Sequence, residues 1–219
     1  CSQRSRRSRS VFDASLAEAN PTLVAYAELL RTAGAERGLI GPREVDRIWD
    51  RHILNCAVVT DPALGLVPDS SSVTDVGSGA GLPGLVWAIV RPDLQVVMVE
   101  PLLRRSVFLT EAVEQLGLSD RVTVLRARAE ELAATWPGSD IVTARAVAPL
   151  AKLLGWTMPL VKPGGALLAL KGVSAADEVA AAEPELRKYG AQSPEIVLAG
   201  DGIVDPATTV VRVAKRPAR

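Results

Sequence analysis

Histidine, cysteine and long apolar runs are scarce in this chain, and each absence excludes a class of protein. The 219 residues include one histidine and two cysteines, Cys1 and Cys56. A disulfide framework or a zinc site needs more such residues at regular spacing, so neither is predicted and no metal is expected. No run approaches the ~20 apolar residues of a membrane helix, and no apolar core follows the arginine- and serine-rich start, as a signal peptide requires. We therefore expect a cytoplasmic protein without a membrane partner.

An excess of charge of one sign is also missing. The 25 basic residues balance 25 acidic residues, which excludes a surface coated in positive potential but not a local basic patch. Twenty of the basic residues are arginine, the side chain that suits planar recognition of phosphate groups and base edges. A GC-rich genome, whose codons favour arginine and alanine, is the simpler explanation of this bias.

The length of the chain allows one domain with a full core. We predict a disordered basic tail over residues 1–10, an N-terminal helical extension over 11–66 and the main domain over 67–219. The extension and the domain are expected to form one compact unit. Asn20 and Pro21 suit the cap and first position of a helix, and Gly34 lies just past its expected end. The apolar side of this helix is expected to consist of Leu23, Tyr26, Ala27 and Leu30.

A second helix of the extension is predicted to start near Pro42. His52 lies on its apolar face, which predicts a core or boundary histidine with one hydrogen bond. Arginines at four-residue spacing line another face, where they are expected to pair with neighbouring acids; contact with phosphate is the alternative. These residues are Arg43, Arg47 and Arg51, with Glu44, Asp46 and Asp50 as the acids.

Strands and helices alternate from residue 72 onward. Predicted strands cover 72–76, 94–99, 122–125, 140–143, 166–171, 195–198 and 208–214, the last two as an antiparallel pair. Predicted helices run through Ile89, over 104–116, over 129–135, within 149–159 and over 174–189, and residues 161–165 are expected to turn the chain. This alternation is typical of an α/β, doubly wound, mostly parallel seven-stranded sheet with an antiparallel last strand.

A glycine loop follows the first strand of this pattern. Gly77, Gly79, Gly81 and Gly84 allow close approach of a ligand to the backbone, and Pro83 suits the first turn of the following helix. A loop at this place in an α/β sheet is where a nucleotide-like cofactor binds. Its match to G-x-G-x-x-G is weak evidence for a dinucleotide.

Acidic residues around the loop favour S-adenosylmethionine over NAD. Asp75 would repel a pyrophosphate, whereas it could orient a methionine ammonium or the N–H groups of the loop itself. Glu100 ends the second strand, where a carboxylate accepts hydrogen bonds from ribose hydroxyls in either cofactor. Glu130 falls after the third strand, on the adenine side of such a site.

Four motifs make the chain similar to a known family. Arg51–Cys56, Asp75–Gly84, Arg145–Leu150 and Leu170–Gly172 resemble the small-subunit ribosomal RNA methyltransferase G family, also called glucose-inhibited division protein B. The similarity extends from about Pro21 to Arg212. It implies a Rossmann-like class I methyltransferase that uses S-adenosylmethionine to methylate N7 of a guanine in the 530 loop of 16S rRNA.

The resemblance also implies cofactor contacts in this chain. These are Gly77, Leu82, Ala129, Glu130 and Arg145, to which the loop argument adds Asp75, Gly79 and Glu100. The chain departs from the family at Asn55-Cys56, where Asp-Ser is frequent, and at Glu100, where Asp is frequent. Ala129 would act through its backbone N–H, so its side chain matters little.

The implied chemistry needs no general base. Guanine N7 carries an in-plane lone pair and no proton, so no catalytic residue is expected, and the protein orients the reactants. Arg145 is expected to brace the cofactor pocket and the O6 atom of guanine; a structural arginine that bridges loop carbonyls is the alternative.

Arg51, Arg104 and Arg105 are the expected RNA contacts of a monomer that acts on 16S rRNA or the small ribosomal subunit. For Arg104 and Arg105, a salt bridge to Glu100 or Glu111 is the alternative. A methyltransferase acting on a small metabolite, an NAD(P)-dependent oxidoreductase and a non-catalytic RNA-binding module are the alternative functions. A metabolite enzyme would have a closed apolar pocket and no salt-dependent RNA binding.

Overall fold

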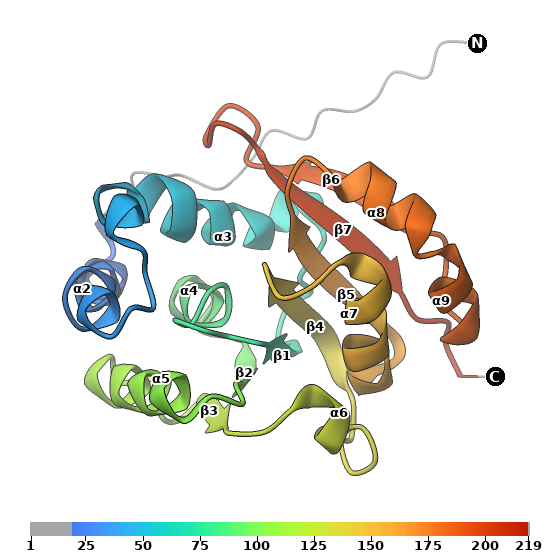
Figure 1. The fold of residues 1–219 in the computed structure, drawn as a ribbon, viewed down its shortest axis with the longest axis horizontal. Helices are drawn as coiled ribbons and strands as arrows, with labels where there is room; N and C mark the ends of the chain where they lie inside the picture. The colour runs from blue at the N-terminus through green and yellow to red at the C-terminus, as the bar shows by residue number, and fades with distance from the viewer. Residues whose placement is uncertain (1–18, 219) are drawn as a thin grey trace.

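The computed structural model describes residues 19–218, in which a seven-stranded sheet lies between layers of helices (Figure 1). The order across the sheet is β3-β2-β1-β4-β5-β7-β6, and β7 runs antiparallel to both of its neighbours while the other pairs are parallel. The strands are β1 (Ser72–Val76), β2 (Gln95–Val99), β3 (Val122–Leu125), β4 (Ser139–Arg145), β5 (Val161–Lys171), β6 (Glu195–Ala199) and β7 (Thr208–Ala214). The predicted fold class is confirmed, and the strand order reverses between β1 and β4, where α/β sheets bind ligands.

Helices cover both faces of the sheet (Figure 1). On one face lie α4 (Gly84–Val90) and α5 (Leu103–Gln115). On the other lie α6 (Ala129–Leu132), α7 (Leu150–Thr157), the 3₁₀ turn η6 (Met158–Leu160), α8 (Ala175–Ala181) and α9 (Glu183–Lys188). Each face has its own cluster of buried apolar side chains, so the sheet is buried on both sides, as parallel strands require.

The segment before β1 forms an outer layer against α4 (Figure 1). It contains α2 (Pro21–Leu29), the π-helix η1 (Leu30–Gly34), the 3₁₀ helix η2 (Pro42–Arg47), the π-helix η3 (Trp49–Leu54), α3 (Asn55–Ala57) and the 3₁₀ turns η4 (Val58–Thr60) and η5 (Pro62–Leu64). The side chain of Asn20 caps α2 by accepting from the N–H groups of Thr22 and Leu23. Leu23 and Ile53 are fully buried in the cluster that also packs on the sheet.

The outer layer therefore shares one core with the sheet over its described part. The predicted division at residues 66 and 67 stays a prediction, because a shared core does not show which part folds alone. The predicted basic tail, residues 1–10, lies outside the described residues.

Four local predictions from the sequence are wrong. Gly34 does not end its helix but lies within η1, and Pro83 is the N-cap of α4 instead of a residue of its first turn. Residues 161–165 belong to β5, because the missing side chain of Gly165 lets the strand approach β4; a Cβ there would lie 2.5 Å from the carbonyl oxygen of Asp140. The predicted helix 174–189 is divided into α8 and α9, since Pro184 lacks the N–H that a continuous helix needs.

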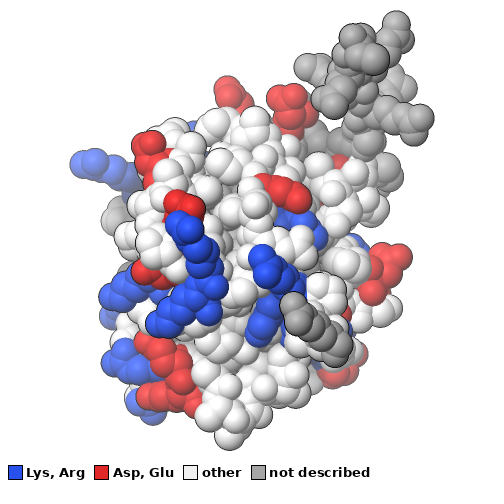
Figure 2. Space-filling model, turned by 90° about the vertical axis from the view of Figure 1, so that its right-hand side faces the viewer, with Lys and Arg blue, Asp and Glu red and all other residues white. Residues whose placement is uncertain are grey.

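No helix in the described part of the chain is both long and apolar enough to cross a membrane. On the face seen in Figure 2, which carries the α8 and α9 side of the molecule, basic and acidic side chains are interspersed. This mixture agrees with the zero net charge of the chain. A basic surface must therefore be sought elsewhere on the molecule.

Candidate functional site

A cavity of about 540 Å³ opens at the carboxyl ends of β1, β2, β3 and β4. Its size falls within the ~300–1,000 Å³ of small-molecule pockets. All of the predicted cofactor residues except Asp75 line it, namely Gly77, Gly79, Leu82, Glu100, Ala129, Glu130 and Arg145. Sequence reasoning missed Val147 and Trp156, which close the side formed by β4 and α7. We call this space the cofactor cavity.

The floor of the cofactor cavity is the glycine loop after β1. Gly77 and Gly79 have φ angles of +70° and +58°, which side chains disfavour. A Cβ on Gly77 would lie 2.8 Å from Cγ2 of Val147. The N–H of Gly77 donates to the carbonyl oxygen of Val99 at 2.8 Å, which holds the loop against the end of β2. The glycines thus form a cradle that a side chain would fill.

Glu100 connects the glycine loop to the start of α5. Its Oε2 accepts from the N–H of Gly79 at 3.0 Å, and its Oε1 accepts from the N–H of Leu102, the N-cap of α5, at 2.9 Å. The residue is 1% exposed, and Arg105 Nη1 lies 3.9 Å from Oε2. Each carboxylate oxygen can accept a further hydrogen bond. The side chain therefore both shapes the loop and keeps capacity for a ribose hydroxyl.

Asp75 lies beneath the loop and is not part of the cavity lining. Its Oδ2 accepts from the N–H of Gly84 at 3.1 Å, and its Oδ1 has no hydrogen-bond partner within the described part of the chain. Complete burial raises the pKa of this carboxyl to about 7, although the Gly84 N–H opposes the rise. Of the two roles predicted for Asp75, orienting the loop's own N–H groups matches these contacts.

Tyr26 supports the loop from the outer layer. Its hydroxyl donates to the carbonyl oxygen of Ala80 at 2.9 Å, and its side chain is fully buried. The sequence placed Tyr26 only on the apolar side of its helix, although a buried tyrosine hydroxyl requires a partner. The loop's shape thus depends on α2, which lies far from it in sequence.

The change Tyr26→Phe is expected to weaken cofactor binding about fivefold, because an unmatched buried hydrogen bond costs about 1 kcal/mol. Calorimetric titration with S-adenosylhomocysteine measures the effect. The matched control is Tyr189→Phe, since Tyr189 is half-buried beside α7 and does not line the cofactor cavity. Equal affinities for the Tyr26→Phe variant and the unchanged protein would contradict a role for this hydroxyl in the loop.

Arg145 is the last residue of β4, whereas the sequence placed it two positions beyond the strand. Its Nη2 donates to the carbonyl oxygen of Arg51 at 3.1 Å and to Nδ1 of His52 at 2.5 Å, and its Nη1 donates to Sγ of Cys56 at 3.2 Å. The guanidinium thereby attaches the outer layer to the sheet. These contacts match the alternative of a bridging structural arginine, although Arg145 also lines the cofactor cavity.

His52 is neutral in this arrangement. Burial and the charge of Arg145 lower its pKa to about 4. Because an arginine can only donate, Nδ1 of His52 must accept, and the proton of the neutral ring is on Nε2. The predicted single hydrogen bond is present, but His52 also lines the cofactor cavity, which its apolar spacing did not indicate.

A second cavity of about 580 Å³ adjoins the first and shares His52, Arg145, Ala146 and Val147 with it. It lies between the ends of β4 and β5, the outer layer and the residues before β7. Charged and polar side chains that line it include Glu44, Arg51, Asn55, Lys171, Glu178 and Thr208. Sequence reasoning assigned them no joint site, although Arg51–Cys56 and Leu170–Gly172 were two of the motifs that it noted. We call this space the second cavity.

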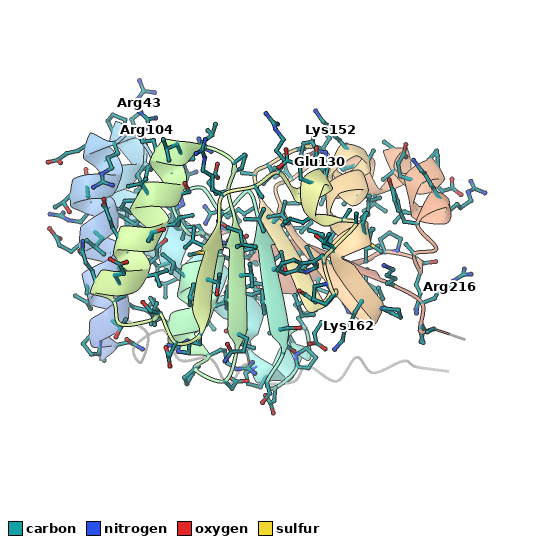
Figure 3. All side chains as sticks on the ribbon, turned by 90° about the horizontal axis from the view of Figure 1, so that it is seen from below. Arg43, Arg104, Glu130, Lys152, Lys162 and Arg216 are labelled. Atoms are coloured by element: carbon teal, nitrogen blue, oxygen red, sulfur yellow. The ribbon has the colours of Figure 1, made fainter. Side chains whose placement is uncertain are left out.

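Several arginines lie at the edge of the sheet where the cavities open. Arg43 and Arg104 lie at the same edge of the sheet as Glu130 and Lys152, while Lys162 and Arg216 lie at the opposite edge (Figure 3). Arg51 pairs with Glu44 at 3.0 Å, as the row of alternating charges predicted. Arg105 lines the cofactor cavity, and Arg51 lines the second cavity. The three predicted RNA contacts therefore lie near the edge that carries both cavities.

The comparisons with known proteins agree with this geometry. Residues 19–203 match the sequence model of a family described as rRNA small subunit methyltransferase G. A relative with the name ribosomal RNA small subunit methyltransferase G from Streptomyces avermitilis is 54% identical over 207 residues, covering 94% of this chain and 83% of its own length. One of the same name from Thermobifida fusca is 57% identical over 196 residues, covering 90% and 80%.

Solved structures at low identity support the fold. A SAM-dependent O-methyltransferase from Thermotoga maritima aligns with a TM-score of 0.55 at 16% identity, covering 80% of this chain and 71% of that one. Such a likeness shows a shared fold and carries no information about the activity or the substrate.

Proposed function

The chain belongs to the rRNA small subunit methyltransferase G family and is an S-adenosylmethionine-dependent methyltransferase, and from this we propose that it methylates N7 of a guanine in the 530 loop of 16S rRNA. The observation that supports the proposal is the family match over residues 19–203, which includes the lining of both cavities except for residues 205–209. Membership of this family argues against the alternatives of an NAD(P)-dependent oxidoreductase and a non-catalytic RNA-binding module.

The residues of the cofactor cavity fit S-adenosylmethionine. Glu100 would accept from the ribose hydroxyls, and the glycine cradle at Gly77 and Gly79 would receive the methionine part. The backbone N–H of Ala129 and the side chain of Glu130 would face the adenine. When bound, the cofactor supplies an electrophilic methyl group on a sulfonium sulfur.

The protein's own contribution is orientation. Guanine N7 attacks through a lone pair that lies in the ring plane, so no side chain has to remove a proton first. Holding two reactants in line can contribute several kcal/mol to lowering the barrier. The second cavity would hold the target base beside the shared wall of His52 and Arg145. A base reaches such a pocket only from a single-stranded loop or after extrusion from a helix.

The charged lining of the second cavity favours RNA over a small apolar metabolite. Arg51 and Lys171 lie there, each paired with a glutamate, and Arg43, Arg104 and Lys152 lie at the same edge of the sheet outside the cavity lining (Figure 3). Cations at this edge would contact the phosphates that flank the target. We propose further that the protein acts as a monomer in the bacterial cytoplasm and that its partner is the small ribosomal subunit.

Deleting the gene is expected to remove 7-methylguanosine from 16S rRNA, and restoring the gene is expected to return it. The reason is that the family matched over residues 19–203 is described as an rRNA small subunit methyltransferase. Mass spectrometry of nucleosides from purified 16S rRNA measures the change. An unchanged amount of 7-methylguanosine in the deletion strain would refute the proposed substrate.

A further inference from the structure

Acidic side chains line the second cavity, although their negative charge alone would repel RNA. Of the described residues, Glu44, Glu178 and Asp205 are the acids that line it. Glu178 is fully engaged, because its oxygens accept from Lys171 at 2.8 Å, from the N–H of Leu150 at 2.7 Å and from Ser174 at 3.0 Å. Asp205 is exposed at the rim. Glu44 is the acid that lies next to the wall shared with the cofactor cavity.

The carboxylate of Glu44 is held in place but can accept further hydrogen bonds. Its Oε1 accepts from Arg51 Nη1 at 3.0 Å. Its Oε2 lies 3.2 Å from Nε2 of His52, which forms no aligned hydrogen bond to any described residue. The side chain is 31% exposed, so a ligand in the cavity can reach it. A carboxylate offers about four lone pairs, and one conventional hydrogen bond leaves most of them open.

A carboxylate at this place suits one base in particular. Guanine presents two adjacent donors, N1–H and the N2 amino group, whereas adenine has an acceptor at N1 and no amino group at C2. Because ionised carboxylates only accept hydrogen bonds, they match the guanine edge and repel the adenine one. Recognition through N1 and N2 also leaves N7 free, whereas a donor aimed at N7 would occupy the lone pair that must attack. Extruded bases are commonly read through this Watson–Crick edge.

We propose that the second cavity binds the target guanine and that Glu44, held by Arg51 and lying beside His52, selects it by accepting from N1–H and the N2 amino group. The inference rests on the proposed function and adds to it the group that recognises the base. In this role Glu44 is a specificity residue for the reaction, and the Arg51 ion pair positions its carboxylate.

Inosine provides an atom-level test, since it equals guanosine without the N2 amino group. Small subunits are reconstituted with 16S rRNA that carries guanosine or inosine at the target position, and kcat/KM for methylation is measured. The unchanged protein is expected to prefer guanosine about tenfold, the value of one hydrogen bond to a charged group. The change Glu44→Gln is expected to reduce this preference to about twofold or less, because a neutral amide gives a weaker acceptor.

The matched control is Glu28→Gln, which removes the exposed Glu28–Arg31 ion pair on α2 and should leave the tenfold preference intact. If Glu44→Gln lowers both rates by the same factor, the glutamate only holds Arg51 and His52, and the inference is overturned. An unchanged protein that methylates inosine and guanosine subunits equally would overturn it as well. If neither subunit is methylated at all, the proposed function itself fails, which is a distinguishable outcome.

Discussion

Replacing Gly77 by alanine is expected to raise the Kd for S-adenosylmethionine about 100-fold, which corresponds to about 3 kcal/mol. Two costs combine at this residue. The φ angle of +70° costs a non-glycine residue roughly 1–2 kcal/mol, and the new Cβ would lie 2.8 Å from Cγ2 of Val147. Because Val147 lines the cofactor cavity, relieving the clash moves the loop or the opposite wall. Calorimetric titration with S-adenosylhomocysteine measures the loss.

Gly117→Ala separates backbone strain from the shape of the cavity. Gly117 has a φ of +66° at the end of α5, yet a Cβ there would contact no described atom within 4 Å. This variant is expected to lose stability through the same strain while its affinity for the cofactor stays unchanged. Affinity within about threefold of the original for Gly77→Ala would show that the loop can relax without cost to binding.

Replacing Arg145 by alanine is expected to reduce both activity and stability. The change leaves Nδ1 of His52, which is partly buried, without its donor, and an unmatched buried polar group costs about 1–3 kcal/mol. We therefore expect the free energy of unfolding to fall by about 1–3 kcal/mol and kcat/KM to fall at least 100-fold, since the wall shared by both cavities loses the hydrogen bonds that hold it. Urea denaturation and a methylation assay measure the two effects.

The variant Arg145→Lys tests whether the bridging hydrogen bonds of Arg145 are required or only its positive charge. One ammonium group cannot replace a planar fork that donates in two directions, so this variant should recover little of the lost stability. The exposed Arg47→Ala variant serves as control and should behave as the original protein. Wild-type activity and stability in Arg145→Ala would mean that the outer layer stays in place without this arginine.

Patterns within single elements allowed most of the fold to be predicted. Alternating runs of apolar residues located the strands, and the glycines after β1 located the cofactor cavity, because both signals are local in sequence. The prediction was wrong at residues 161–165, where proline and glycine suggested a turn. There, pairing with β4 outweighs local preference, and Gly165 is required by the neighbouring strand instead of by a turn.

The connections between elements could not be predicted from such patterns. Tyr26 and Ala80 are 54 positions apart, and Arg145 and Arg51 are 94 apart. No spacing rule links residues at such distances, so Tyr26 was interpreted as an apolar residue and Arg145 as a residue directed at the ligand. The second cavity was missed for the same reason, since its lining comes from segments spread between residues 44 and 209.

The outer layer is hydrogen-bonded to β7, so the catalytic site can be completed only when both segments have been synthesised. The hydroxyl of Thr208 donates its one proton to Asn55, whose backbone and side-chain oxygens lie 2.9 and 2.6 Å from Oγ1. The outer layer leaves the ribosome early, whereas Thr208 begins the last strand and leaves it late. Contacts between such distant segments form slowly, because a long loop must close first. We therefore expect the nascent chain to complete its catalytic site only after β7 has left the ribosome, so that a translation product truncated before β7 would be inactive even with its glycine loop intact.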